Sequence, residues 1–124
     1  MKRNMELVRN ILIQIEEHNP RTVVKVIMEE NDQFTEDEID YHLKLMVDAG
    51  LIDGQAKRVM GGGLMVNVRG LTWQGHDFLD AARNDKVWEK AEATAQDKGM
   101  DLSSLPLDIV KDLLVESTKA LLGF

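Results

Sequence analysis

The amino-acid sequence predicts an α+β fold in which helices surround a single β-hairpin. A helical pattern ends at A-G-L-I, residues 49–52, where Gly50 suits a helix terminus. Two strand-like stretches follow and are separated by the glycines at 61–63. The segment L-T-W-Q-G-H-D-F-L, which begins at Leu71, then has the composition of a helix start. This order is typical of a winged helix-turn-helix domain, here with a two-stranded wing and additional C-terminal helices.

The size and composition of the chain are those of a small globular protein. Its 124 residues and 14.0 kDa allow one domain with a core, plus an appendage. The sequence has no apolar run near the roughly 18 residues that a membrane span needs, and no secretory signal pattern. The absence of cysteine excludes disulfides and thiolate metal sites. We therefore expect a cytoplasmic protein without membrane association.

Residues 4–18 carry the pattern of an amphipathic helix. Their apolar side chains recur at helical spacing: Val8, Ile11, Leu12 and Ile15. The Asn19-Pro20 pair ends this pattern, because proline cannot continue a helix. Residues 22–28 are rich in β-branched side chains and are predicted to form a short strand, although their apolar spacing also fits a helix.

A second helix is predicted from Thr35 to Ala49. Thr35 and Glu38 have the spacing of a capping box, in which each side chain accepts a hydrogen bond from the other residue's backbone. The apolar positions that follow are Ile39, Leu43, Met46 and Val47. In a winged helix the second helix of the helix-turn-helix pair normally enters the major groove of DNA.

The wing is predicted from residues 51–60 and 64–71, paired as an antiparallel hairpin. On the second arm Leu64, Val66 and Val68 alternate with more polar residues, as in a strand with one covered face. The triple glycine between the arms is a turn rather than a phosphate-binding loop, because no Lys-Ser/Thr pair and no helix follow it directly.

Three helical stretches are predicted after the wing. Thr72 is expected to cap the first and Asp85 the second, while Pro106, after Ser103 and Ser104, opens the third. The predicted core positions of the first two are Trp73, Phe78, Leu79, Ala82, Val87, Trp88, Ala91 and Ala95.

The domain organisation follows from these stretches. We expect residues 1–84 to form the winged-helix domain and residues 85–124 to form a helical extension. The last helix has an apolar stripe from Leu107 to Leu122 that is wider than one small core needs. The extension therefore either packs on the domain or pairs with a second chain as a homodimer.

The charges on the second helix oppose DNA binding. A net charge of −7 disfavours non-specific binding to phosphates, so the distribution of charge matters. Only Tyr41, His42 and Lys44 on this helix are suited to contact bases. Its acidic residues are Glu36, Asp37, Glu38, Asp40 and Asp48.

The hairpin has the opposite charge. Lys57, Arg58 and Arg69 lie in it, and Asp53 is its only acid, so it is a candidate for phosphate contacts. The alternative is a solvated hairpin whose charged side chains keep an exposed sheet edge soluble. The candidate nucleic-acid-binding residues are Lys57, Arg58, Arg69, Lys44, Tyr41 and His42.

The sequence has no constellation typical of an enzyme. The three histidines are dispersed and lack zinc spacing. His76 lies near Thr72 without an orienting acid, which favours a structural histidine that is at least half buried. Trp73 and Trp88 could stack on single-stranded nucleic acid, but their spacing favours the core. We expect no enzyme activity, no cofactor and no metal.

Three segments resemble a known family: K-R-N-M-E-L-V-R from Lys2, Y-H-L-K-L-M-V-D-A-G-L-I from Tyr41 and L-T-W-Q-G-H-D-F-L-D-A-A-R-N-D-K-V-W from Leu71. Over essentially its whole length the chain is similar to DUF2513, an uncharacterised domain family of bacteria and their phages. The resemblance implies a winged-helix fold and a protein of phage or prophage type. It implies no activity.

Two functions of different classes therefore stay open. The first is a nucleic-acid-binding or regulatory module that contacts double-stranded DNA through the wing. The second is an acidic protein–protein interaction module that meets a basic partner without contacting DNA. A clustered basic face in the folded protein would favour the first function, and a continuous acidic face with an apolar groove would favour the second.

Overall fold

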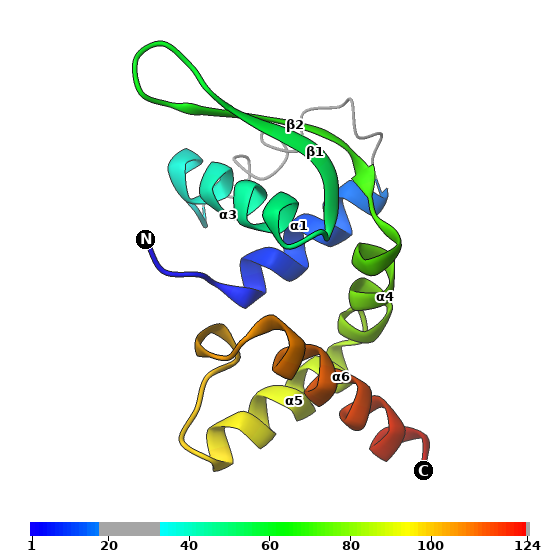
Figure 1. Ribbon diagram of the computed structural model, residues 1–124. Coiled ribbons are helices and arrows are strands. Elements are labelled where there is room, and N and C mark those ends of the chain that lie inside the picture. The colour runs from blue at the N-terminus through cyan, green and yellow to red at the C-terminus, as the bar shows by residue number, and fades with distance from the viewer. Residues whose placement is uncertain (18–32, 124) are drawn as a thin grey trace. The chain divides into compact units, whose positions relative to one another are not determined.

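The computed structural model describes residues 1–17 and 33–123 (Figure 1). Along the chain the elements are α1 (Met5–Glu17), α3 (Glu36–Asp48), β1 (Ile52–Arg58), β2 (Leu64–Leu71), α4 (Trp73–Ala82), α5 (Asp85–Asp97), the 3₁₀ helix η1 (Leu102–Ser104) and α6 (Leu107–Leu122). The predicted α+β fold is confirmed, and a two-stranded antiparallel sheet between helices is compatible with a winged helix. The strand predicted at 22–28 lies outside the described residues.

Internal contacts divide the chain into two compact units, Met1–His76 and Asp77–Phe124. The division falls inside α4, between His76 and Asp77. The assignment of residues 1–84 to one functional domain stays a prediction.

Helix α1 is capped by the residue that precedes it, Asn4. The Asn4 side-chain oxygen accepts hydrogen bonds from the backbone N–H groups of Glu6 and Leu7, at 3.0 and 3.2 Å. The predicted apolar stripe is confirmed, because all of its members are buried: Val8, Ile11, Leu12 and Ile15. Burial of each such side chain stabilises the fold by about 1.5 to 3 kcal/mol.

Helix α3 begins at the predicted capping box. The Glu38 backbone N–H donates to Thr35 Oγ1 at 3.1 Å, and the Thr35 N–H donates to Glu38 Oε1 at 3.3 Å. Behind this cap Ile39, Leu43 and Met46 are buried. The helix packs against α1 on one side and against both strands on the other.

The ribbon of β1 and β2 is the predicted wing. Its register runs from Ile52 opposite Leu71 to Arg58 opposite Leu64, with an irregularity after Asp53 that the sequence did not indicate. In Figure 1 the ribbon runs alongside α3 and its tip extends past the start of that helix. The Val59 N–H donates to the Gly63 carbonyl at 2.9 Å and closes the turn.

The start of α4 is fastened to the turn between α3 and β1. The Thr72 N–H donates to the Leu51 carbonyl at 3.1 Å, and its hydroxyl donates to the Gly50 carbonyl. The same hydroxyl accepts from the Gly75 N–H at 2.9 Å, so Thr72 caps the helix as predicted. A Cβ on residue 75 would overlap the Leu51 carbonyl, which explains why glycine stands there.

Trp73 corrects the predicted core, because its side chain is 80% exposed whereas Phe78 and Leu79 are buried. Helical geometry gives the reason. The buried positions of α4 are Gly75, Phe78, Leu79 and Ala82, which share one face. Trp73 precedes Phe78 by five residues rather than three or four, so it projects from the opposite face.

The second unit packs α5 against α6 and η1. Its buried side chains include Val87, Trp88, Ala91, Ala95, Leu102, Val110 and Leu114, which confirms the core predicted for α5. Asn84, and not Asp85, caps α5, since its side chain accepts from the N–H groups of Lys86 and Val87. Pro106 stands directly before α6 without a side-chain cap bond, and Ser103 and Ser104 belong to η1.

Candidate nucleic-acid interface

The exposed part of α3 is acidic. Glu36, Asp37 and Asp48 are exposed, while most of the helix is covered by α1 and the ribbon. Lys44 Nζ donates to Asp48 Oδ2 at 2.8 Å, so the cation predicted to contact DNA is already paired with a carboxylate. Without rearrangement, this helix presents net negative charge to any ligand.

His42 is not available to a nucleic acid, which corrects its place among the predicted contacts. Its ring is buried between α3 and the start of α1. Nδ1 lies 2.7 Å from the Glu38 carbonyl oxygen, and Nε2 accepts the Asn4 backbone N–H at 2.8 Å. These partners require a neutral ring that carries its proton on Nδ1. The histidine therefore joins two helices.

Tyr41 is half-buried and lies beside His42. The two ring centroids are 5.7 Å apart with an interplanar angle of 81°, an edge-to-face contact. Of the three α3 residues predicted to contact bases, Tyr41 is the one that is neither buried nor held in an ion pair within the described residues.

The cations of the ribbon differ in their surroundings. Arg69 Nη2 donates to Asp53 Oδ1 at 3.0 Å across the base of the ribbon. The hydrogen bond from Arg69 to Asp53, and then their charge attraction, raise the pKa of the arginine above its usual value. Arg69 is thus charged, but its charge is balanced locally by Asp53.

Lys57 and Arg58 lie near the far end of β1, and both are exposed. Within residues 1–17 and 33–123 neither forms an ion pair. Neighbouring residues of a strand point to opposite faces, and the register places Lys57 opposite Met65 and Arg58 opposite Leu64. The two cations therefore lie on the two faces of the ribbon instead of forming one flat basic patch.

The wing tip also exposes apolar side chains that the sequence reasoning did not single out. Met60 is fully exposed, and Val59 and Met65 are exposed beside it. The sequence contained a signal for the exposure of Met60. A residue directly before a triple glycine in a hairpin has no neighbouring side chain to cover it. The tip thus combines two unpaired cations, apolar side chains and three residues without side chains.

A second exposed feature of the first unit lies at the start of α4. Trp73 shares its side of the first turn with His76, three residues later. His76 Nδ1 lies 4.0 Å from Glu16 Oε2, and the histidine side chain is 55% exposed rather than at least half buried as predicted. Trp73 is therefore a surface aromatic on a backbone that Thr72 and Gly75 hold in place.

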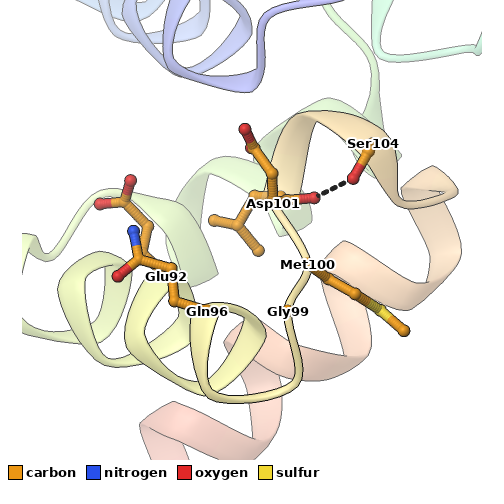
Figure 2. A pocket seen from close by; sticks show the side chains of 7 residues that line it. Glu92, Gln96, Gly99, Met100, Asp101 and Ser104 are labelled. Carbon is orange, nitrogen blue, oxygen red and sulfur yellow. Dashed lines mark hydrogen bonds between the residues drawn. The ribbon is translucent and has the colours of Figure 1, made fainter.

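A hollow of about 450 Å³ lies in the second unit, where α5 meets η1 (Figure 2). Its lining residues are Glu92, Gln96, Gly99, Met100, Asp101, Leu102 and Ser104. The Ser104 hydroxyl donates to the Asp101 carbonyl at 2.8 Å, and Met100 points away from Glu92 and Gln96. The hollow contains none of the residues predicted to contact nucleic acid, and its charged groups are carboxylates.

In the part of the chain that the structure describes, none of the helices has the length and apolar character needed to cross a membrane.

Comparison with known proteins gives a family and a relative. The model of the family described as "Hypothetical protein (DUF2513)" matches residues 2–101. The chain is 35% identical over 113 residues to a protein of Haemophilus influenzae described as an uncharacterized protein, covering 91% of this chain and 92% of the relative. No solved structure matches the chain. With a family model that spans the ribbon, the start of α4 and the whole of α5, the chain belongs to the DUF2513 family.

Proposed function

We propose that this protein is a non-enzymatic regulatory module of phage or prophage type that acts in the cytoplasm and contacts double-stranded DNA through its wing. The observation that carries the proposal is the position of Lys57 and Arg58. Both are exposed at the far end of the ribbon, and neither is paired with a carboxylate within the described residues. Unpaired cations on a protruding element can release counterions from phosphates, which is the main source of affinity for DNA.

The wing is favoured over α3 by charge. A carboxylate that faces a phosphate is repelled, and the first turn of α3 exposes Glu36 and Asp37. Lys44 and Arg69 would first have to leave Asp48 and Asp53. DNA binding is therefore expected to be weak and to fall as the salt concentration rises. It should depend little on the base sequence.

Fluorescence anisotropy of a labelled duplex at low salt tests this proposal. The double variant Lys57→Gln/Arg58→Gln should lose most of the affinity, and the salt slope should fall by about one for each lost phosphate contact. Lys44→Gln is the matched control, because it removes an exposed lysine that is already paired with Asp48. Equal losses in the double variant and the control would rule out a specific role for the wing.

Docking of a protein at Trp73 is a second candidate. It belongs to the same class as the interaction-module alternative, although that alternative relied on the acidic helix rather than on Trp73. An 80% exposed tryptophan on a fixed backbone suits an interface anchor, since tryptophan is enriched among residues that dominate binding energy. A pull-down from host extract, with and without nuclease, separates this function from DNA binding. Trp73→Ala should abolish nuclease-resistant capture, while the neighbouring exposed Gln74→Ala should not.

A homodimer through the C-terminal helices is proposed as the assembly. α5 covers Val110 and Leu114 of the α6 stripe, whereas Leu121 and Leu122 at its end are 49% and 68% exposed. Sedimentation equilibrium at micromolar concentration tests it, with a 14.0 kDa species contradicting the dimer. Leu121→Asp is the informative variant, because Leu121 is exposed and its replacement should leave the monomer folded. An aspartate at the buried position 114 would instead unfold the chain.

A further inference from the structure

The start of α4 places an exposed aromatic side chain beside a carboxylate. Trp73 is 80% exposed, His76 lies one helical turn after it, and Glu16 Oε2 of α1 lies 4.0 Å from His76 Nδ1. We call these three side chains the Trp73 patch. We propose that this patch binds an arginine side chain of a basic protein segment, with the guanidinium stacked on the indole and directed toward Glu16. The inference rests on the second candidate function, docking of a protein at Trp73, and specifies the chemistry of the partner.

Trp73 is presented to solvent on a backbone that the fold holds in place. The Thr72 N–H donates to the Leu51 carbonyl at 3.1 Å, and the Thr72 hydroxyl accepts the Gly75 N–H at 2.9 Å. The backbone under the indole is therefore ordered before a partner arrives, which lowers the entropic cost of binding. The face of an indole ring carries partial negative charge and attracts cations more strongly than the other aromatic rings do.

The charge beside Trp73 also favours a cation. Glu16 lies in the last turn of α1, where the helix dipole is negative, so its carboxylate does not stabilise the helix that carries it. The Glu16 side chain is 28% exposed, and its 4.0 Å separation from His76 is too long for a hydrogen bond. A carboxylate has several acceptor positions, so Glu16 can accept N–H groups from a ligand in addition to its contacts within the chain.

Arginine fits this arrangement better than lysine. Its planar guanidinium can stack on a ring through its face and donate hydrogen bonds to a carboxylate from its edge. A lysine ammonium is a compact, strongly hydrated charge and cannot do both. Side chains three residues apart on a helix are neighbours, so a group stacked on Trp73 also lies next to His76, which contacts Glu16.

Other ligands for the Trp73 patch are less well matched. Proteins that stack bases of single-stranded nucleic acid on aromatic rings line the same groove with cations. Here the group beside the aromatic residue is the Glu16 carboxylate, which repels phosphates. Arg69, four residues before Trp73, is paired with Asp53 at 3.0 Å and adds no net charge. A purely apolar partner would gain nothing from Glu16.

Two peptides that differ only in charge test the proposal. The unmodified full chain would be titrated with a capped pentapeptide, Gly-Ser-Arg-Ser-Gly, and with the same peptide carrying citrulline, which has the shape of arginine without its charge. The indole N–H signal of Trp73 is followed by ¹H–¹⁵N NMR and is assigned by its absence in Trp73→Phe. The arginine peptide should shift this signal and not that of the buried Trp88. The citrulline peptide should bind about threefold to tenfold more weakly.

Variants of the patch give the second measurement, with the backbone amide signal of His76 as the reporter. Glu16→Gln should weaken binding of the arginine peptide about threefold to tenfold and leave binding of the citrulline peptide unchanged. Glu6→Gln is the matched control, because Glu6 is an exposed carboxylate in the first turn of the same helix. It should bind like the unmodified protein. Trp73→Leu, which keeps an apolar side chain without a ring, should lose binding of the arginine peptide.

The outcomes separate the inference from the function on which it rests. Equal binding of the two peptides, or equal effects of Glu16→Gln and Glu6→Gln, would overturn the inference and leave docking at Trp73 intact. If neither peptide shifts the Trp73 signal, the inference is overturned. Docking then stands only if Trp73→Ala still loses nuclease-resistant capture.

Two further measurements identify a different ligand. A Trp73 signal that responds to a ten-residue oligothymidine, and not to the arginine peptide, would assign the patch to nucleic acid and overturn the inference. A signal that moves when the protein alone is diluted, and does not respond to the peptide, would assign the patch to a second copy of the chain and overturn it as well. None of these results depends on DNA binding by Lys57 and Arg58.

Discussion

Helix α3 and the ribbon are consecutive in the chain and pack against each other, yet they use their side chains in opposite ways. α3 places Ile39, Leu43 and even His42 in the interior. The ribbon leaves its distal side chains in solvent and retains unpaired cations there. In a winged helix, α3 would be the helix that binds the major groove of DNA. Here most of its side chains are instead covered by the rest of the fold.

The difference teaches that the position of an element in a fold pattern does not determine its role. The role of an element depends on how many of its side chains are already buried, hydrogen-bonded or ion-paired within the fold. In α3 hydrogen bonds and burial account for His42, and an ion pair accounts for Lys44. In the ribbon no such use within the described residues accounts for Lys57 or Arg58.

The strongest test of this contrast is stability. Leu43→Ala removes a buried side chain of α3 and should lower the free energy of unfolding by about 2 to 5 kcal/mol. Met65→Ala on the exposed face of the ribbon should change it by less than about 0.5 kcal/mol. Urea denaturation followed by circular dichroism gives both values. Similar losses in the two variants would mean that the ribbon is as structural as the helix.

His42 gives the next largest effect. His42→Leu fills the same buried position with an apolar side chain but removes the acceptor for the Asn4 N–H and the donor to the Glu38 carbonyl. Leaving such groups unsatisfied should cost about 1 to 3 kcal/mol. In the unmodified protein, ¹⁵N NMR should show the proton on Nδ1. A proton on Nε2 would contradict the hydrogen-bond assignment, and a stable variant with reduced DNA affinity would return His42 to the interface.

The acidic start of α3 should act on affinity more than on stability. Glu36→Gln combined with Asp37→Asn removes repulsion on the element that packs beside the ribbon, so DNA affinity should rise several-fold. The helix loses a favourable dipole interaction of about 0.3 to 1 kcal/mol per charge at its first turn. Anisotropy and thermal denaturation measure the two effects. A fall in affinity would show that these carboxylates contact the ligand.

The smallest effect is expected at the base of the ribbon. Asp53→Asn removes the partner that balances Arg69, so DNA affinity should rise slightly while the thermal midpoint stays the same. The pKa of Arg69 would return toward its ordinary value, and the residue would stay charged at neutral pH. Anisotropy on the same duplex measures the change. An affinity that does not respond would place Arg69 away from the ligand.

Local patterns in the sequence predicted local structure well. The spacing of Thr35 and Glu38 predicted the capping box, and the triple glycine predicted the turn of the wing, because both depend on a few neighbouring residues. The ends of the described helices were predicted to within a few residues for the same reason.

Properties that depend on distant residues were not predictable in this way. His42 looked available until the start of α1, far along the chain, supplied its hydrogen-bond partner. Arg69 looked free until the register brought Asp53 beside it. Trp73 was different, since its five-residue separation from Phe78 already placed the two on opposite faces of one helix.

The two tryptophans give the protein a pair of optical reporters. Trp73 belongs to the first compact unit and is exposed to solvent, while Trp88 belongs to the second unit and is buried. An enclosed indole emits at shorter wavelength and resists collisional quenchers, so the two signals are separable in one spectrum. Replacing Trp73 by Phe leaves a signal from the second unit alone, and replacing Trp88 leaves one that responds to whatever touches the first. The melting of each unit can thus be followed without an added dye.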